Sequence, residues 1–118
     1  MKLGFLMIIL TMLDDGGLSA AFVNTQTLEE CQDRAAVVRA ILEQGEQPIE
    51  QLVCRASQAR FEPFVHGADA DAERRAYLIS FDDEIATVEP AASCAAAAAS
   101  RDGRHCATTT QKPLSQPR

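Results

Sequence analysis

The sequence has few aromatic side chains: it contains no tryptophan and one tyrosine, and aromatics make up 5% of its 118 residues. Stacking platforms for bases or sugar rings are therefore scarce. Basic residues are also in deficit, 11 against 17 acidic residues, which gives a formal net charge of −6. Because phosphate backbones are bound mainly by clustered Lys and Arg, this composition argues against a general attraction to nucleic acid. We expect no nucleic-acid partner.

The patterns that carry catalysis, phosphate binding or metal binding are missing too. No glycine-rich phosphate loop is present, and Ser57, Ser80 and Ser93 lack the flanking glycines of a nucleophile elbow. Zinc sites usually contain paired ligands about two to four residues apart, and the chain has no such pair. The acidic residues 69–73 begin like a calcium-binding loop, but the glycine and the glutamate that should follow are absent. We therefore predict no enzyme activity, no metal site and no cofactor.

Long apolar runs are absent, with one exception near the N-terminus. Residues 3–13 are almost wholly apolar. As a helix, such a run would span about 16 Å, roughly half of a bilayer's hydrocarbon core, so we expect no stable membrane span. Lys2 before the run and Ser19-Ala20-Ala21 after it are typical of a secretory signal peptide over residues 1–21.

The alternative interpretation keeps this segment as a β-hairpin over residues 3–23. Asp15-Gly16 is a dipeptide that type I′ hairpin turns favour, because both central residues of such a turn need a positive φ. A long strand that is apolar on both faces needs cover above and below, however, and roughly 100 further residues supply little of it. The sequence therefore favours the signal peptide and leaves the hairpin as the alternative.

The clearest element is an amphipathic helix over residues 28–44. Thr27 and Glu30 have the spacing of a capping box, and Gly45 with Pro48 marks the end of the helix. Apolar residues recur every three or four positions and form one stripe along it. The stripe consists of Leu28, Cys31, Ala35, Val38 and Leu42, widened by Ile41.

The residues after this helix predict strands. Residues 49–56 alternate as a strand does, and residues 76–81 and 84–88 resemble a hairpin around Asp82-Asp83. The compositional break near Pro90 marks the best internal boundary.

These elements together predict an α+β fold, with one main amphipathic helix packed on a small, mostly antiparallel sheet. We expect residues 22–90 to form this small domain, after the signal peptide or the retained hairpin. We expect residues 91–118 to form a short Ala-rich helix followed by a disordered, basic tail, because alanine favours helix and the last residues are polar.

Four cysteines, at positions 31, 54, 94 and 106, predict two disulfides. Cys31 lies on the apolar stripe of the helix and Cys54 on the inward face of the strand that follows, so antiparallel packing brings these two together. Cys94 and Cys106 lie on either side of a bend in the C-terminal unit. We therefore predict the pairs Cys31–Cys54 and Cys94–Cys106. Closing a loop of about twenty residues contributes about 3 kcal/mol to stability. The alternative is free thiols in a reducing compartment, with Cys31 as a small buried hydrophobe.

One loop gathers residues suited to contact a partner. Phe61, Phe64 and His66 cluster there around a proline, and Arg74 and Arg75 follow. Exposed aromatic side chains anchor protein interfaces, so these five residues are candidate partner contacts. For the two phenylalanines the sequence favours the other interpretation, in which they fold back and cover the core.

The predicted function is therefore binding or structural rather than catalytic. We expect a small secreted or periplasmic module, held together by disulfides, whose partner is a protein. The alternative is a cytoplasmic or membrane-associated protein that retains its apolar hairpin and keeps its thiols reduced. A small metal-binding protein is the third choice.

Overall fold

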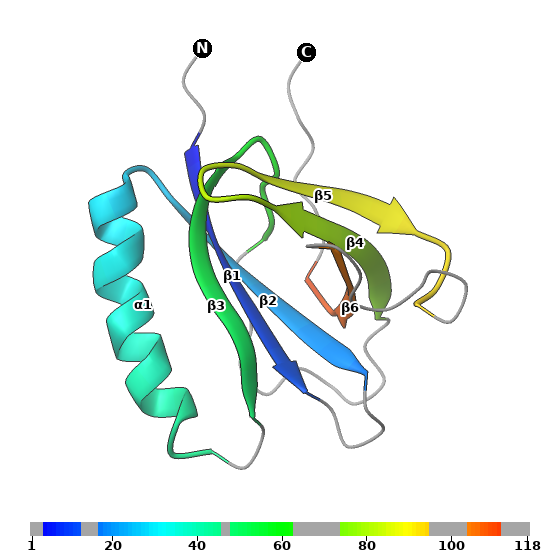
Figure 1. The fold of residues 1–118 in the computed structure, drawn as a ribbon, viewed down its shortest axis with the longest axis horizontal. Helices are drawn as coiled ribbons and strands as arrows, with labels where there is room; N and C mark the ends of the chain where they lie inside the picture. The colour runs from blue at the N-terminus through cyan, green and yellow to red at the C-terminus, as the bar shows by residue number, and fades with distance from the viewer. Residues whose placement is uncertain (1–3, 13–16, 46–47, 63–73, 95–103, 112–118) are drawn as a thin grey trace.

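The structure, a computed structural model, describes residues 4–12, 17–45, 48–62, 74–94 and 104–111, and within them one helix lies against one curled sheet (Figure 1). In chain order the elements are β1 (Gly4–Met12), β2 (Leu18–Thr25), α1 (Leu28–Leu42), β3 (Ile49–Ser57), β4 (Arg75–Phe81), β5 (Ala86–Ala91) and β6 (Arg104–Thr109). The expected fold is confirmed in its main feature, a helix on a mostly antiparallel sheet, although strands dominate more than the sequence predicts.

The six strands lie in the order β3-β1-β2-β6-β4-β5. They fall into two antiparallel groups of three, β3-β1-β2 and β6-β4-β5. The two groups meet between β2 and β6 through one parallel pair, Ser19 with Thr108. On the opposite side, Ala56 of β3 forms a bridge with Ile85, and its N–H donates to the carbonyl of Glu84 at 2.9 Å. The sheet therefore curls until its two outermost strands meet.

β1 is the central strand of the first group, and both of its faces are buried. Leu6, Ile8 and Leu10 point into the interior of the curled sheet. Met7 and Ile9 point to the outer face, where α1 covers them. The sequence alone suggested that too little chain remained to cover both faces, but curling the sheet and docking one helix supply that cover. β1 pairs with β2 in an unbroken antiparallel register, while the predicted turn dipeptide, Asp15-Gly16, lies among residues 13–16, which are outside the described residues.

The start of α1 matches the sequence prediction. The hydroxyl of Thr27 accepts a hydrogen bond from the N–H of Glu30 at 3.0 Å, while the Glu30 carboxylate accepts one from the N–H of Gln26 at 2.9 Å. The helix ends two residues earlier than predicted, at Leu42, and Glu43 caps it. Both ends therefore follow from local sequence to within two residues.

The face that α1 buries is narrower than predicted. Cys31 is buried, and Ala35, Val38 and Leu42 pack around it on the outer face of the sheet. Ile41, expected to widen this stripe, is 64% exposed. At 100° per residue it lies on the flank of the helix, away from the buried stripe.

Both predicted disulfides are present, Cys31–Cys54 and Cys94–Cys106. Cys54 pairs with Met7 across β3 and β1, so it lies on the face that α1 covers. The first bridge therefore ties α1 to the first group of strands. The second ties the segment after β5 to β6, within the second group, so neither bridge links the two groups to each other.

The C-terminal region differs from the prediction. Ala91, the expected start of a short helix, instead ends β5. Residues 104–109 form β6, although 104–107 were expected between that helix and the tail, and 108–109 in the disordered tail itself. Gln111, assigned to the disordered tail, is buried. Strand pairing with β4 decides this outcome, because it extends on one side to Ala91 and on the other to Thr109. Residues 95–103, which hold most of the expected helix, and residues 112–118 lie outside the described part of the chain.

Pro90 lies inside β5 rather than at a boundary between segments. β5 is an outer strand, and the carbonyl of Ala86 on its free side accepts from the Ser57 hydroxyl at 2.8 Å. Because strand residues alternate, the nitrogen of Pro90 also faces this free side, where no ladder hydrogen bond is needed. Proline at such a position disfavours pairing of the sheet edge with a strand of another chain, because it lacks the N–H that would donate.

Among the residues that the structure describes, no helix is both long enough and apolar enough to cross a membrane.

The burial of Phe61 leads to one direct prediction. Phe61 is 2% exposed, so Phe61→Ala should lower the free energy of unfolding by about 3 kcal/mol or more, because it removes a large buried ring. Urea denaturation of the disulfide-bonded protein measures the change. Ile85→Ala, at a side chain that is 47% exposed, serves as the control and should cost less than about 1 kcal/mol. A loss at Phe61 no larger than at Ile85 would contradict the core assignment.

Candidate functional site

Phe61, one of the candidate contact residues, belongs to the core rather than to an exposed surface. Its ring stacks on Phe22 with centroids 4.0 Å apart and meets Tyr77 edge-on at 5.5 Å. The side-chain amide of Asn24 donates to the Phe61 carbonyl at 2.6 Å and accepts from its N–H at 3.2 Å. Phe61 therefore takes the core position that the sequence favoured for it, and its ring closes the interior of the curled sheet.

The other candidate residues have different positions. Phe64 and His66 lie outside the described residues. Arg74 and Arg75 are exposed and line a hollow of about 350 Å³ where β4 begins and β5 ends, together with Tyr77. Nothing in the structure tests whether these two arginines contact a partner, so that contact stays a prediction.

Arg74 also joins the two groups of strands. Its guanidinium donates to the hydroxyl of Ser19 at 2.9 Å, and to the hydroxyl and the carbonyl of Thr108, both at 3.0 Å. Ser19 and Thr108 are the single residue pair through which β2 and β6 meet. Arg74 therefore has a structural role at this junction.

Gln111 completes the same junction in a way that sequence reasoning missed. The N–H of Phe22 donates to its side-chain oxygen at 2.7 Å, and its side-chain nitrogen donates to the Phe22 carbonyl at 2.8 Å. It donates also to the carbonyl of Glu62 at 2.7 Å. The buried amide thus takes the place of a neighbouring strand. A glutamine in a polar tail carries no local pattern that predicts this role.

The acidic hairpin tip is exposed at its carboxylates but held at its backbone. The Asp82 carboxylate accepts from the N–H groups of Glu84 and Ile85, both at 2.8 Å. Arg55 donates to the Asp82 carbonyl and lies over the ring of Phe81, with its guanidinium carbon 5.4 Å from the centroid. The tip therefore docks on β3 and closes the sheet.

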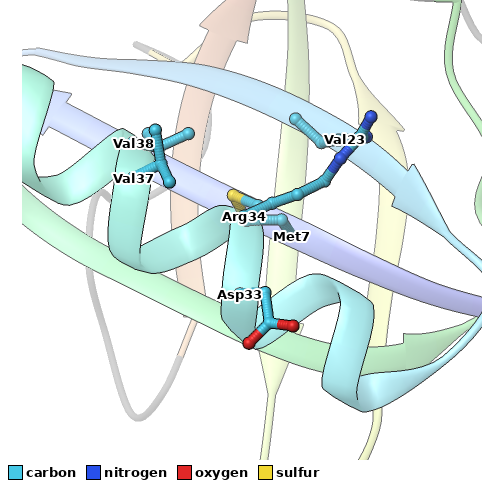
Figure 2. A pocket seen from close by; sticks show the side chains of 6 residues that line it. All are labelled: Met7, Val23, Asp33, Arg34, Val37 and Val38. Carbon is cyan, nitrogen blue, oxygen red and sulfur yellow. The ribbon is translucent and has the colours of Figure 1, made fainter.

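A groove of about 500 Å³ runs between α1 and β2 (Figure 2). Its lining is mostly apolar and consists of Met7, Val23, Asp33, Arg34, Val37 and Val38. Met7 and Val23 come from β1 and β2, and the remaining residues come from α1. In Figure 2 the Arg34 side chain leaves the helix and extends towards Val23, across the floor of the groove.

The helix flank beside this groove exposes apolar side chains. Val37 is 61% exposed and Ile41 is 64% exposed, one turn apart. Arg34 makes no hydrogen bond or ion pair with any part of the chain that the structure describes. An apolar ridge beside an apolar groove, crossed by an unpaired cation, can bind an apolar surface that carries negative charge.

The sequence does indicate this flank, through apolar residues of the helix that lie outside its main apolar stripe. Val37 lies off the buried stripe, four residues before Ile41, and both were apolar where a solvated helix flank is usually polar. Arg34 lies next to them on the same flank. Only the placement of β2 beside the helix turns this flank into one wall of a groove.

The described residues offer neither a cluster of metal ligands nor a free thiol. No group of three or more His, Cys, Asp or Glu side chains within them could hold a metal ion. All four cysteines are bound in disulfides, so none offers a free thiolate in this state.

No family model, no curated protein and no solved structure matches the chain. The function must therefore be argued from the geometry of this molecule alone.

The hydrogen bonds of the hairpin tip lead to a prediction about how stability depends on pH. Hydrogen bonds from the N–H groups of Ile85 and Glu84 hold the pKa of Asp82 below its ordinary value. The ionised carboxylate therefore stabilises the fold above about pH 4, and this contribution is lost as the pH falls through the lowered pKa. Asp82→Asn keeps an acceptor oxygen but removes the titration, so its unfolding midpoint in urea should fall less than that of the natural protein between about pH 5 and pH 2.

The matched control for this prediction is Asp83→Asn, because the neighbouring Asp83 carboxylate accepts no hydrogen bond from the described part of the turn. It removes the same charge and should follow the pH dependence of the natural protein. If the unfolding midpoint became equally insensitive to pH in both variants, net charge rather than the turn at Asp82 would govern the pH dependence of stability.

Proposed function

We propose that this chain is a small exported module, stabilised by two disulfides, that acts by binding a protein at the groove between α1 and β2. The observation that carries the proposal is the exposed apolar flank of α1, Val37 and Ile41, beside that groove. The partner surface is a helix with apolar side chains for this flank and negative charge for Arg34.

Arg34 supplies the charge argument for this partner. Its guanidinium crosses the groove without a partner among the described residues (Figure 2). A carboxylate, or the C-terminal end of a helix, would neutralise it at short range. Apolar area alone gives affinity with little selectivity, so this cation would set how the partner is oriented.

The disulfides support an oxidising location. Each links segments within one group of strands. Such bridges persist in extracellular or periplasmic surroundings and are rare in reducing ones. A mature domain of this size is stable by only about 5–10 kcal/mol. One bridge worth about 3 kcal/mol is therefore a large share of that stability.

The exported module we propose keeps β1 and β2 in its fold. Cleavage after Ala20 or Ala21 would remove β1 and divide β2. The first group of strands would lose Leu6, Ile8 and Leu10, all fully buried. The apolar run can direct export and still serve as the central strand only if these residues stay attached.

The second candidate is a cytoplasmic or membrane-associated protein with the same hairpin and reduced thiols. The paired strands β1 and β2 favour its retained hairpin. The two disulfides favour the exported form instead, because reduced thiols would leave α1 without its link to β3.

An intact mass separates these candidates. Protein from the natural source should contain residues 4–25, and its mass should be lower by two hydrogens for each disulfide than that of the fully reduced chain. It should be recovered from the secreted or periplasmic fraction. A product that begins after Ala20 or Ala21 would contradict the retained hairpin, and four free thiols in freshly alkylated material would contradict export.

Photo-crosslinking tests the binding surface. A photoreactive residue at Val37 should give a crosslinked product in the producing cell, because this side chain lies beside the groove. The same residue at Arg39, on the opposite flank of α1, is the matched control and should give none. The Val37 product should disappear when Arg34→Glu is added. Equal products at both positions, or a product that persists with Arg34→Glu, would contradict the proposed site.

A further inference from the structure

We infer that the partner at the α1–β2 groove is a second copy of this chain, packed antiparallel about a two-fold axis. The inference rests on the proposed function, because it names the partner of the same site. It follows from the pattern of side chains along the exposed flank of α1.

This flank has the spacing of a helix–helix seam. Glu30, Arg34, Val37, Ile41 and Gln44 recur at alternating intervals of four and three residues, the spacing with which one helix packs along another. Glu30, Arg34 and Val37 are exposed, and the last two border the groove. None of these three residues belongs to the stripe that α1 buries against the sheet. We call these five residues the outer seam. The outer seam is therefore a second helix face, left open by the fold.

Antiparallel packing of two outer seams places apolar residues together at the centre. With the two-fold axis near residue 39, Val37 of each copy faces Ile41 of the other. An interface of this kind uses the same patch twice, so both exposed side chains are buried in both copies. The second helix then lies along the groove, with Met7 and Val23 beneath it.

The same alignment gives Arg34 a partner. Arg34 of one copy faces Gln44 of the other, immediately after the end of α1. The last turn of α1 carries the negative end of the helix dipole, which favours a cation nearby, although the carbonyls of Arg39, Ile41 and Leu42 already accept from the N–H groups of Glu43, Gln44 and Gly45. The outer seam therefore supplies both the cation and the negative helix end, and a second copy satisfies both at once.

Parallel alignment lacks this complementarity. Each residue would then face its own copy, so the two Arg34 guanidiniums would lie together next to the axis. The net charge of −6 on each chain opposes either dimer at long range. Added salt should therefore tighten the antiparallel dimer, because it screens this repulsion more than the short-range apolar contacts.

Sedimentation equilibrium of the purified, disulfide-bonded full chain tests the inference. The mass should rise from 12.8 kDa for the monomer towards twice that value as concentration increases. The range should reach about 500 µM, because a small seam is expected to give only micromolar affinity. Val37→Asp should weaken association at least tenfold. Ile85→Asp, the same change at an exposed apolar residue remote from the seam, is the control and should leave it unchanged.

A charge exchange tests the alignment itself. Arg34→Glu should weaken association, and Arg34→Glu with Gln44→Arg should restore it, because the two positions face each other across the axis. Arg39→Glu makes the same charge change on the opposite flank and should have no effect. A purely structural role of Arg34 would not be rescued at Gln44.

The outcomes separate this inference from the proposed function. A monomer at the highest concentration, with crosslinking at Val37 still lost in Arg34→Glu, would overturn self-association and leave the binding site with a different partner. Association that Val37→Asp does not weaken would place any dimer elsewhere on the molecule and overturn the inference. Absence of both association and Val37 crosslinking would overturn the inference and the proposed function together.

Discussion

Burial of β1 on both faces is the constraint on which the rest of this structure depends. Leu6, Ile8 and Leu10 need an interior on one side, while Met7 and Ile9 need cover on the other. A flat sheet with one helix would satisfy only the second requirement. The sheet therefore curls until β3 meets the tip of the β4–β5 hairpin, and the enclosed interior receives the first set.

Side chains, more than ladder hydrogen bonds, close this curled sheet. Arg74 and Gln111 join β2 to the second group of strands where only one residue pair connects their backbones. Arg55 and Ser57 hold β3 against the hairpin on the other side. The two disulfides lie within the groups rather than between them. Cohesion between the groups therefore depends on the shared interior and these few polar side chains.

The position of the helix explains why a groove exists at all. Cys31–Cys54 ties α1 to β3, at one edge of the first group of strands (Figure 1). The helix consequently covers β3 more fully than β2. The outer face of β2 at Val23 is left as the floor of the groove, and the flank of α1 that carries Val37 and Ile41 becomes its wall. One covalent link thus both stabilises the domain and leaves its candidate binding surface open.

Local sequence determined the start of the helix at Thr27, the strand after it, the hairpin around Asp82 and both disulfide pairs, because caps, periodicity and turn residues act over a few positions. Tertiary structure decided the rest. It made Phe61 a core residue, Gln111 a substitute for a strand and residues 104–109 a strand in place of the expected C-terminal unit. Each of these depends on partners 37 to 89 residues away along the chain, or on pairing with β4. A pattern confined to neighbouring residues has no access to such contacts, whereas the folded chain brings them within hydrogen-bonding distance.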